Sequence, residues 1–492
     1  MLVEKYIVPP YSYKITKNDC AQIYSVKTIL DVSKYNTMAL AIEKQILKEK
    51  GTLETGILKF DALLIFLKQL VKEKLVNFFS VKTEKKYSLL CDWITYKIIG
   101  FEQIMALLID DNVQEIYLDK PETPIYIDHQ KYGRCLTNIY LSEKEISSLK
   151  SRICLEKDVV INRLNPSLKA ELKTRNFHVR VAIDVPPLAS DGICMNIRKL
   201  RKKIWSLPEL IQNNMLTLEA ATYLLFILKR RFNFTIIGEP GSGKTTLANA
   251  IDLLTPPDWR KITIEDVIES IEQTQFNKFQ TRYSVSPFDS NFSDTSKSKE
   301  IIKLLHRSPT WVFLGEIQTS EHSKALFEAL SAGLVGIQTC HGRSIEMMIL
   351  RWTNQHAIPL SSILSLDLII ETSYSLINWK VIRRVNRIVE IAKGALHAGK
   401  FINSLNDLKL IDVFKYNVQK NSLTKQIDLY NSPIIKIICE KEGLTKELFE
   451  EELVQIKSNL DFLLKNKLYN PQKVIDLLTR RDKFPIIEKL TN

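Results

Sequence analysis

The 492-residue sequence lacks several features that would assign it to a particular class of protein. No uncharged apolar run reaches the roughly 18 residues that a membrane-spanning helix needs, so we expect no such helix. The first residues, Met1–Tyr6, do not have the charged-then-apolar layout of a secretory signal, so we expect the protein to stay in the cytoplasm. The seven cysteines form no C-x-x-C pair, which argues against a zinc site and is typical of free thiols in a reducing compartment. Neither internal repeats nor low-complexity tracts occur.

What the sequence does contain is ordinary for a globular protein, with one exception. Hydrophobic residues make up 45% and charged residues 25% of the chain, whose length allows about three domains. The exception is a formal charge of +13, with basic clusters at 198–203, 229–231 and 383–387. Such a charge fits a nucleic acid or an anionic membrane face as partner, arginines that serve nucleotide phosphates and subunit contacts, or simply a solvated basic surface.

The strongest local signal is the segment 238–245, which fits the phosphate-binding template G-x-x-x-x-G-K-[ST] at every fixed position. Its glycines allow a tight curl that points backbone N–H groups at phosphate oxygens. Lys244 can reach the terminal phosphates and the Thr245 hydroxyl can bind Mg²⁺. The alternative is a glycine-rich turn with a chance lysine. The predicted nucleotide-binding residues here are Gly238, Glu239, Pro240, Gly241, Ser242, Gly243, Lys244, Thr245 and Thr246.

The flanking sequence provides the strand–loop–helix order that a phosphate loop needs. Residues 234–237 are typical of a buried strand, and 246–251 of the opening of a helix, whose N-terminus carries partial positive charge. Four more strands are predicted at 261–264, 311–314, 336–339 and 368–370. Because they alternate with helical segments, we expect a parallel sheet with helices on both faces and ligands at the carboxyl ends of its strands.

The remaining sequence predicts further domains. We expect a helical N-terminal region at 1–95, an α/β domain at 96–205, the nucleotide-binding domain at 206–395 and a helical C-terminal extension at 396–492. In the second domain, strands are predicted at 115–118, 125–128, 177–183 and 194–198. Ser142 and Glu145 form a capping-box pattern that predicts a helix through about Leu155.

Polar side chains follow three of the predicted strands. Glu316 lies two residues after the strand at 311–314, where a carboxylate can orient Mg²⁺, although an acid there can also cap a helix. Glu265 follows 261–264 and is the candidate base for the attacking water, while Glu265 or Asp266 can alternatively cap a following helix. His341 follows 336–340 and can sense the γ-phosphate or hold a carboxylate, or be purely structural.

Phosphoryl transfer also needs positive charge on the moving group. An arginine from a neighbouring subunit would couple hydrolysis to assembly, and the alternative for each candidate is a surface arginine. The candidates are Arg152, Arg180, Arg198 and Arg282, and their spacing does not rank them.

Together these motifs resemble the secretion ATPase superfamily, which powers type II and type IV secretion and pilus assembly. The resemblance is greatest to the archaeal branch, which assembles archaella and type IV-like pili. Four boxes occur in the family's order: the Walker A segment 238–245, the aspartate box 263–266, the Walker B segment 314–317 and the histidine box 332–341. The segments 126–133, 165–170 and 196–199 are similar to the family's N-terminal domain, so that the resemblance covers about 96–395.

Three departures from the family pattern occur. Gln318 stands where arginine is usual, Thr310 stands in place of the aspartate of R-P-D, and Leu334 replaces the first histidine of its box. Nucleotide binding should survive these changes, whereas the hydrolysis rate and the coupling between subunits are put in question, because Gln318 supplies no positive charge.

The resemblance implies a RecA-like α/β domain with a parallel sheet, preceded by a smaller PAS-like α/β domain. It also implies an ATP- and Mg²⁺-dependent homohexamer at the cytoplasmic face of the membrane, which moves pilin subunits through a polytopic membrane platform protein. In this scheme Lys244, Glu265, Glu316, His341 and Arg282 are catalytic, Arg198 binds the nucleotide, and Thr245 and Glu316 hold the metal.

Two other functions stay open. One is a RecA-like motor that translocates nucleic acid, which the basic charge permits; the lack of an aromatic-interleaved basic stretch argues against it. The other is an ATP-gated scaffold with little hydrolysis, which the three departures keep open.

Overall fold

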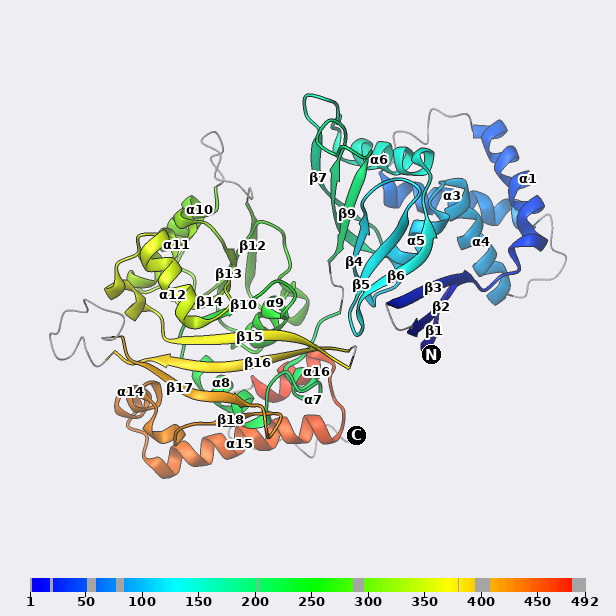
Figure 1. Cartoon of the computed structure of the whole chain (residues 1–492). Helices are drawn as coiled ribbons and strands as arrows, with labels where there is room; N and C mark the ends of the chain where they lie inside the picture. Colours follow the sequence, from blue (N-terminus) through cyan, green and yellow to red (C-terminus); the bar gives the residue numbers. More distant parts are fainter. Residues whose placement is uncertain are drawn as a thin grey trace. The chain divides into compact units, whose positions relative to one another are not determined.

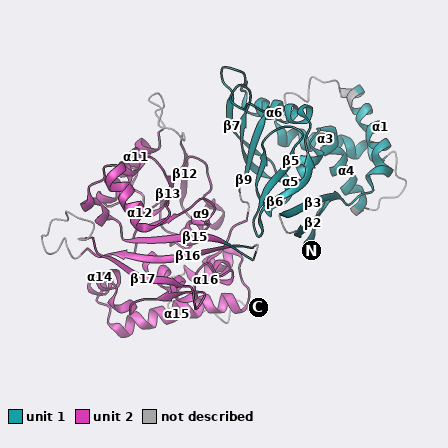
Figure 2. Cartoon of the chain, viewed as in Figure 1, with its two compact units in different colours: residues 1–202, 376–381 teal, residues 203–375, 382–492 magenta. Residues whose placement is uncertain are grey.

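The computed structural model describes two compact units (Figures 1 and 2). It describes residues 2–17, 21–50, 59–76, 84–200, 203–285, 296–378, 380–393 and 408–479. Unit 1 comprises Met1–Lys202 with Leu376–Val381, and unit 2 comprises Lys203–Ser375 with Ile382–Asn492.

Unit 1 is built on a nine-stranded sheet of order β1-β2-β3-β6-β5-β4-β9-β8-β7. Its strand pairs are antiparallel except for β3 and β6, which run parallel. The strands are β1 (Leu2–Val8), β2 (Tyr11–Lys17), β3 (Gln22–Thr28), β4 (Val113–Leu118), β5 (Pro124–His129), β6 (Gly133–Tyr140), β7 (Ser167–Lys173), β8 (His178–Asp184) and β9 (Cys194–Lys199).

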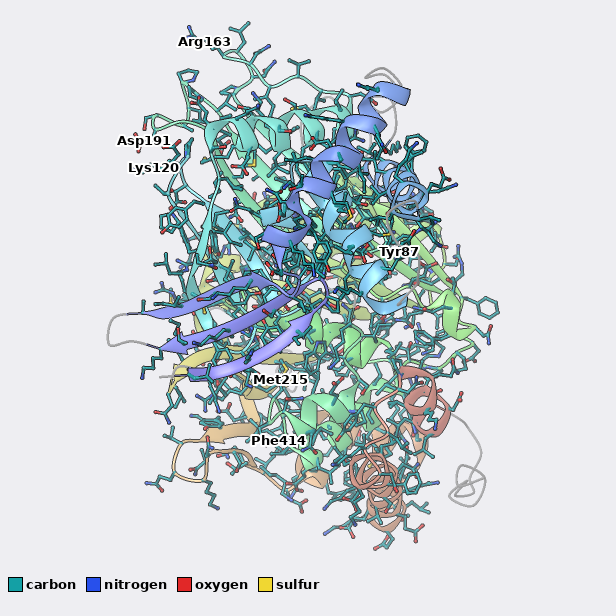
Figure 3. The ribbon with its side chains drawn as sticks, turned by 90° about the vertical axis from the view of Figure 1, so that its right-hand side faces the viewer. Tyr87, Lys120, Arg163, Asp191, Met215 and Phe414 are labelled. Atoms are coloured by element: carbon teal, nitrogen blue, oxygen red, sulfur yellow. The ribbon has the colours of Figure 1, made fainter. Side chains whose placement is uncertain are left out.

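Alternation along these strands buries one face of the sheet under helices. Ile116, Ile127 and Val181 contribute to a core that also takes in residues of α5 and α6. A second core joins α1, α3 and α4. The helices are α1 (Val32–Lys50), α3 (Phe60–Val76), α4 (Glu84–Ile98), α5 (Glu102–Ile109) and α6 (Glu143–Lys157). Lys120, Arg163 and Asp191, from three different loops, project into solvent at one edge of this unit (Figure 3).

Unit 2 contains a second nine-stranded sheet, of order β12-β11-β13-β14-β10-β15-β16-β17-β18. From β12 to β15 all neighbours are parallel, so the carboxyl ends of these strands share one edge. The strands are β10 (Phe234–Gly238), β11 (Lys261–Glu265), β12 (Gln280–Ser284), β13 (Trp311–Ile317), β14 (Gly336–His341), β15 (Leu368–Ile377), β16 (Lys380–Ile391), β17 (Leu410–Asn417) and β18 (Ser422–Lys425).

Helices cover both faces of this sheet (Figure 1). Phe234 and Ile236 face one core with α8 and α9, whereas Ile237 faces the other with α11, as expected for a strand buried on both sides. The helices are α7 (Leu207–Gln212), α8 (Leu218–Leu228), α9 (Lys244–Asp252), α10 (Lys297–Lys303), α11 (Ser320–Ser331), α12 (Ile345–Leu350), α14 (Pro433–Glu442), α15 (Lys446–Lys465) and α16 (Pro471–Leu478).

Most predicted elements are confirmed, and the parallel sheet with helices on both faces is the RecA-like α/β architecture expected. All five strands predicted in the nucleotide-binding domain exist, and α6 begins with the predicted capping box, in which Ser142 and Glu145 bond each other's backbone N–H. Apolar residues at helical spacing also predict a helix over 57–67; residues 57 and 58 lie outside the described residues, and 60–67 lie in α3.

Two predictions about the ends of the chain are wrong. The region 1–95 is not wholly helical, because β1, β2 and β3 extend the sheet of unit 1. Within β2, Tyr11, Tyr13 and Ile15 are buried and the residues that alternate with them are not, a strand alternation that the prediction missed. The extension 396–492 likewise contributes β17 and β18 before its helices begin.

Candidate nucleotide-binding site

The loop between β10 and α9 has the shape of a phosphate cradle. Gly241 and Gly243 have φ of 78° and 94°, a region that residues with a Cβ atom rarely adopt. A Cβ atom on Gly238 would lie 2.4 Å from Thr372 Oγ1, so this position also requires glycine. The crest of the loop, Glu239 to Gly241, is exposed, whereas Ser242 is buried. Thr245 and Thr246, both half-buried, lie in the first turn of α9.

The Lys244 amine lies inside the curl of this loop. Its Nζ donates to the carbonyl oxygens of Gly238 and Glu239, at 3.0 Å each, and lies 3.2 Å from His341 Nδ1. Since a lysine ammonium has no acceptor, His341 Nδ1 accepts this hydrogen bond. The amine of Lys244 is therefore held inside the loop by the two carbonyl oxygens and His341, which a phosphate can replace as hydrogen-bond acceptors.

His341 connects this amine to Glu316. With Nδ1 accepting, the neutral imidazole carries its proton on Nε2, which lies 3.0 Å from Glu316 Oε1. Gln318 Nε2 donates to the other carboxylate oxygen at 2.5 Å. A directed chain thus runs from Lys244 through His341 to Glu316, across the carboxyl ends of β10, β14 and β13.

A bulge in β13 sets the direction of Glu316. Leu314 pairs with Gln338 and Ile317 with Cys340, so β13 has one residue more than β14 over this interval. Bulges re-aim side chains and are frequent beside active sites. Gly315 allows the close approach of β11, because a Cβ atom there would lie 2.8 Å from Glu265 Cγ.

Glu265 lies beside this bulge and is 2% exposed. Its carboxylate accepts hydrogen bonds from the backbone N–H groups of Glu269 and Ser270, at 3.1 to 3.2 Å. Burial raises its pKa to about 7, although the hydrogen bonds from Ser270 and Glu269 oppose the shift. No helix follows directly, so the helix-cap alternative does not hold: Asp266 instead forms an ion pair with Lys297 at 3.3 Å.

Three further residues contact the loop that sequence reasoning did not single out for this role. The Thr372 hydroxyl lies 2.9 Å from Ser242 Oγ, and Arg383 Nε donates to the Gly241 carbonyl at 2.7 Å. Arg343 Nε lies 3.3 Å from Glu239 Oε1. Arg383 was noted only as part of a basic cluster, and no local pattern marks Thr372.

The candidate arginines lie on elements other than those that carry Lys244, His341 and Glu316. Arg282 lies on β12, opposite Thr263 of β11, and pairs with Glu272 at 2.9 Å. Arg152, Arg180 and Arg198 belong to unit 1. Arg180 and Arg198 are register neighbours on β8 and β9, and Arg198 lies 3.8 Å from Glu115. Their role at a nucleotide stays a prediction.

The donor set fits a hard cation held together with phosphate oxygens. Thr245 offers a hydroxyl and Glu316 a carboxylate, the oxygen ligands that Mg²⁺ prefers beside nucleotide phosphates. Within the described ranges, no group of three or more His, Cys, Asp or Glu side chains is arranged to hold a metal alone.

Comparison with known proteins identifies the family. The family model "Type II/IV secretion system protein" matches residues 95–378, more than half of the chain. The chain belongs to this family.

Three relatives share about a quarter of their aligned residues with this chain. Uncharacterized protein MJ0781 of Methanocaldococcus jannaschii is 25% identical over 351 residues, 65% of this chain and 47% of that protein. Uncharacterized protein MJ1287 of the same organism is 24% identical over 52% of this chain and 89% of its own length. Type IV secretion system protein PtlH of Bordetella pertussis is 28% identical over 49% of this chain and 76% of its own length. The chain thus spans less than half the length of the first of these relatives.

Solved structures give weak overall superpositions. The VirB11 ATPase of the Brucella suis type IV secretion system is 21% identical over 59% of this chain and 92% of its own, with a TM-score of 0.30. The pilus retraction motor PilT with bound ADP is 15% identical over 77% of this chain and 97% of its own, with a TM-score of 0.41.

In the part of the chain that the structure describes, no helix is both long enough and apolar enough to cross a membrane.

Proposed function

We propose that this protein is a Mg²⁺-dependent ATP hydrolase that drives assembly of an archaeal type IV-like pilus, archaellum or related secretion filament. Family membership supports the class of machine, and the relatives from Methanocaldococcus jannaschii support the archaeal branch. The single observation that carries the hydrolase activity is the chain of contacts from Lys244 through His341 to Glu316 at the carboxyl ends of parallel strands.

The residues divide the work of phosphoryl transfer. Loop N–H groups and Lys244 bind the phosphates, and Glu265 accepts a proton from the attacking water, for which a pKa near 7 is suited. His341 holds Glu316 in one orientation and exchanges its bond to Lys244 when phosphate enters. Mg²⁺, when bound through Thr245 and Glu316, neutralises phosphate charge. Arg282 or an arginine of unit 1 supplies further positive charge.

The larger assembly belongs to the same proposal. Six copies would form a ring at the cytoplasmic face of the membrane, and a polytopic platform protein would transmit their motion to pilin subunits. The charge of +13 suits an anionic membrane face. Removing the protein's gene, or replacing it with a Lys244→Ala copy, should abolish the filaments seen by electron microscopy.

Phosphate release from Mg²⁺-ATP tests the activity. Lys244→Ala should lower the rate by about 100-fold or more, because the terminal phosphates lose their cation. Lys436→Ala, at an exposed site on α14, is the matched control and should retain the parental rate. Equal rates in the parent and in Lys244→Ala would refute the proposal. Strong stimulation by DNA would favour a nucleic-acid motor, and tight ATP binding without phosphate release would favour a scaffold.

A further inference from the structure

A buried lysine lies between the two acidic strand ends of unit 2. Lys297, the first residue of α10, is 0% exposed. Its Nζ donates to the Glu316 carbonyl at 2.6 Å and pairs with Asp266 at 3.3 Å. A buried ammonium is costly unless it is paired and hydrogen-bonded. The contacts with Glu316 and Asp266 supply both, so the surroundings of Lys297 are suited to a cation. Lys297 thereby ties the end of β11 to the end of β13.

An arginine holds the same region on the other side of Glu316. Arg351 begins the π-helical segment Arg351–Gln355 that follows α12. Its Nη2 donates to the Gln318 carbonyl at 2.8 Å, and its Nη1 donates to the His341 carbonyl at 3.2 Å. π-helical turns are rare and are often found at functional sites. Arg351 thereby ties the end of β13 to the end of β14.

The two cations bracket the segment whose direction matters. The bulge in β13 leaves Glu316 outside the regular ladder, so the ladder alone does not fix its backbone. Lys297 holds the carbonyl of Glu316 itself, and Arg351 holds the carbonyl two residues later. Gln318, whose carbonyl accepts the hydrogen bond from Arg351, supplies no charge of its own. Both cations act through backbone carbonyls, and neither is a direct ligand of the Glu316 carboxylate in the contacts described.

We propose that Lys297 and Arg351 are positioning residues, which brace the bulge of β13 so that Glu316 and His341 stay aligned with Lys244. Lys297 of α10 and Arg351, which follows α12, supply fixed positive charge that the uncharged Gln318 does not supply. This inference rests on the proposed ATP hydrolysis, since alignment of Glu316 matters only if that carboxylate serves the nucleotide.

Turnover and nucleotide affinity measured on the full chain separate positioning from mere packing. Lys297→Met and Arg351→Met should each lower kcat by about 10- to 100-fold, as partners that orient a metal ligand do, while the KM for ATP changes less than about threefold. Arg351→Lys should recover part of the loss, because one ammonium can hold one of the two carbonyls. Lys303→Met, on the same helix and paired with Glu300, is the control and should be unchanged.

Three outcomes would overturn the brace. The first is a kcat within about twofold of the parent in both Met variants. The second is a parallel loss of kcat and nucleotide affinity that follows a lowered melting temperature, which is what a packing role predicts. The third is no difference between Arg351→Lys and Arg351→Met. If Lys297→Met does not fold, the two Arg351 variants still decide.

A parent that shows no hydrolysis at all would refute the proposed function instead. The positioning role is then tested by the affinity of each protein for a fluorescent ATP analogue, measured with and without Mg²⁺. Mg²⁺ should raise this affinity in the parent and raise it less in Lys297→Met and Arg351→Met. An equal gain from Mg²⁺ in all three proteins would overturn the inference.

Discussion

At the scale of the residue, burial shifts the pKa of the Glu265 carboxyl group well above its usual value. Burial raises its pKa to about 7, and the charge of Glu269 adds to the shift. The carboxylate faces the backbone of 269–270, so the loop that follows β11 controls its environment. A carboxyl group with this pKa is divided between acid and base near neutral pH, which is where a general base is most effective.

The pH dependence of turnover follows from this pKa. Because only the ionised Glu265 accepts a proton, kcat should fall about tenfold for each pH unit below about 7 and level off above it. Glu269→Gln removes a neighbouring charge that raises the pKa, so its profile should move to lower pH. Steady-state kinetics between pH 5.5 and 8.5 would measure both curves. A kcat that does not depend on pH in the parent would exclude Glu265 as the base.

Glu265 should also make folding stability depend on pH. Between pH 4.5 and about 7 the folded protein keeps a proton that the unfolded chain has released, so the stability contributed by this group is full below 4.5 and is lost as the pH rises through about 7. The loss is at most about 3 kcal/mol. Glu265→Gln should therefore gain in melting temperature, relative to the parent, when the pH is raised from 5 to 8. A difference that stays constant over this range would contradict the shifted pKa.

At the scale of the element, α9 is anchored at both of its ends. Its first residue, Lys244, is held by the phosphate loop. Its last residue, Asp252, is 1% exposed and accepts hydrogen bonds from Trp311 Nε1 of β13, at 2.8 Å, and from Gln273. Lys261 of β11 lies 3.3 Å from the same carboxylate. The end of α9 opposite to the phosphate loop is thus in contact with β11 and β13, the strands that carry Glu265 and Glu316.

Breaking the buried pair should be costly. Lys261→Met leaves the Asp252 charge without its cation, and we expect a loss of about 3–5 kcal/mol in the free energy of unfolding. Lys261→Met combined with Asp252→Asn should recover part of the loss, because no charge is then left buried. Denaturant unfolding of the three proteins would measure these differences. An unchanged midpoint for the single variant would show that the pair is not coupled to the core.

The sequence predicts those parts of the site that a local pattern encodes. The phosphate loop, Glu265, Glu316 and His341 could be found because each directly follows a recognisable strand. Thr372 and Arg383 could not, because they reach the loop from 130 and 142 residues away along the chain. The bulge at Glu316 is equally hidden, since it exists only in the pairing of β13 with β14. Pairing between distant strands is decided by packing rather than by local sequence.

At the scale of the whole molecule, two units share the predicted functional residues. Lys244, Glu265, Glu316, His341 and Arg282 belong to unit 2, whereas Arg152, Arg180 and Arg198 belong to unit 1. The N-terminal strands β1–β3 are part of unit 1, where the hydroxyls of Tyr6 and Tyr24 donate to Asp110. Their alternating pattern is present in the sequence, but it is short and is followed by long helical segments, which led to the wrong prediction for this region.

The contribution of unit 1 to turnover can be tested through its arginines. Arg180→Ala and Arg198→Ala should each lower kcat by about 10-fold or more, if these guanidinium groups neutralise charge on the transferred phosphoryl group. Arg180→Ala should change nucleotide affinity little, whereas Arg198→Ala should also weaken it, because Arg198 is a predicted nucleotide-binding residue. Arg163→Ala, at an exposed position of the same unit, is the control. Measuring kcat and nucleotide affinity together separates the two effects. Parental kcat in both variants would leave Arg152 and Arg282 as the remaining candidates.

In the proposed function, Glu316 acts on a bound nucleotide at the end of the series of contacts that runs from Lys244 through His341. Phosphate release and ATP binding by Glu316→Gln, measured side by side with the parent in Mg²⁺, test it most directly. The variant should bind ATP within about threefold of the parent and release phosphate at least about 100-fold more slowly. Phosphate release at the parental rate by Glu316→Gln would contradict the account.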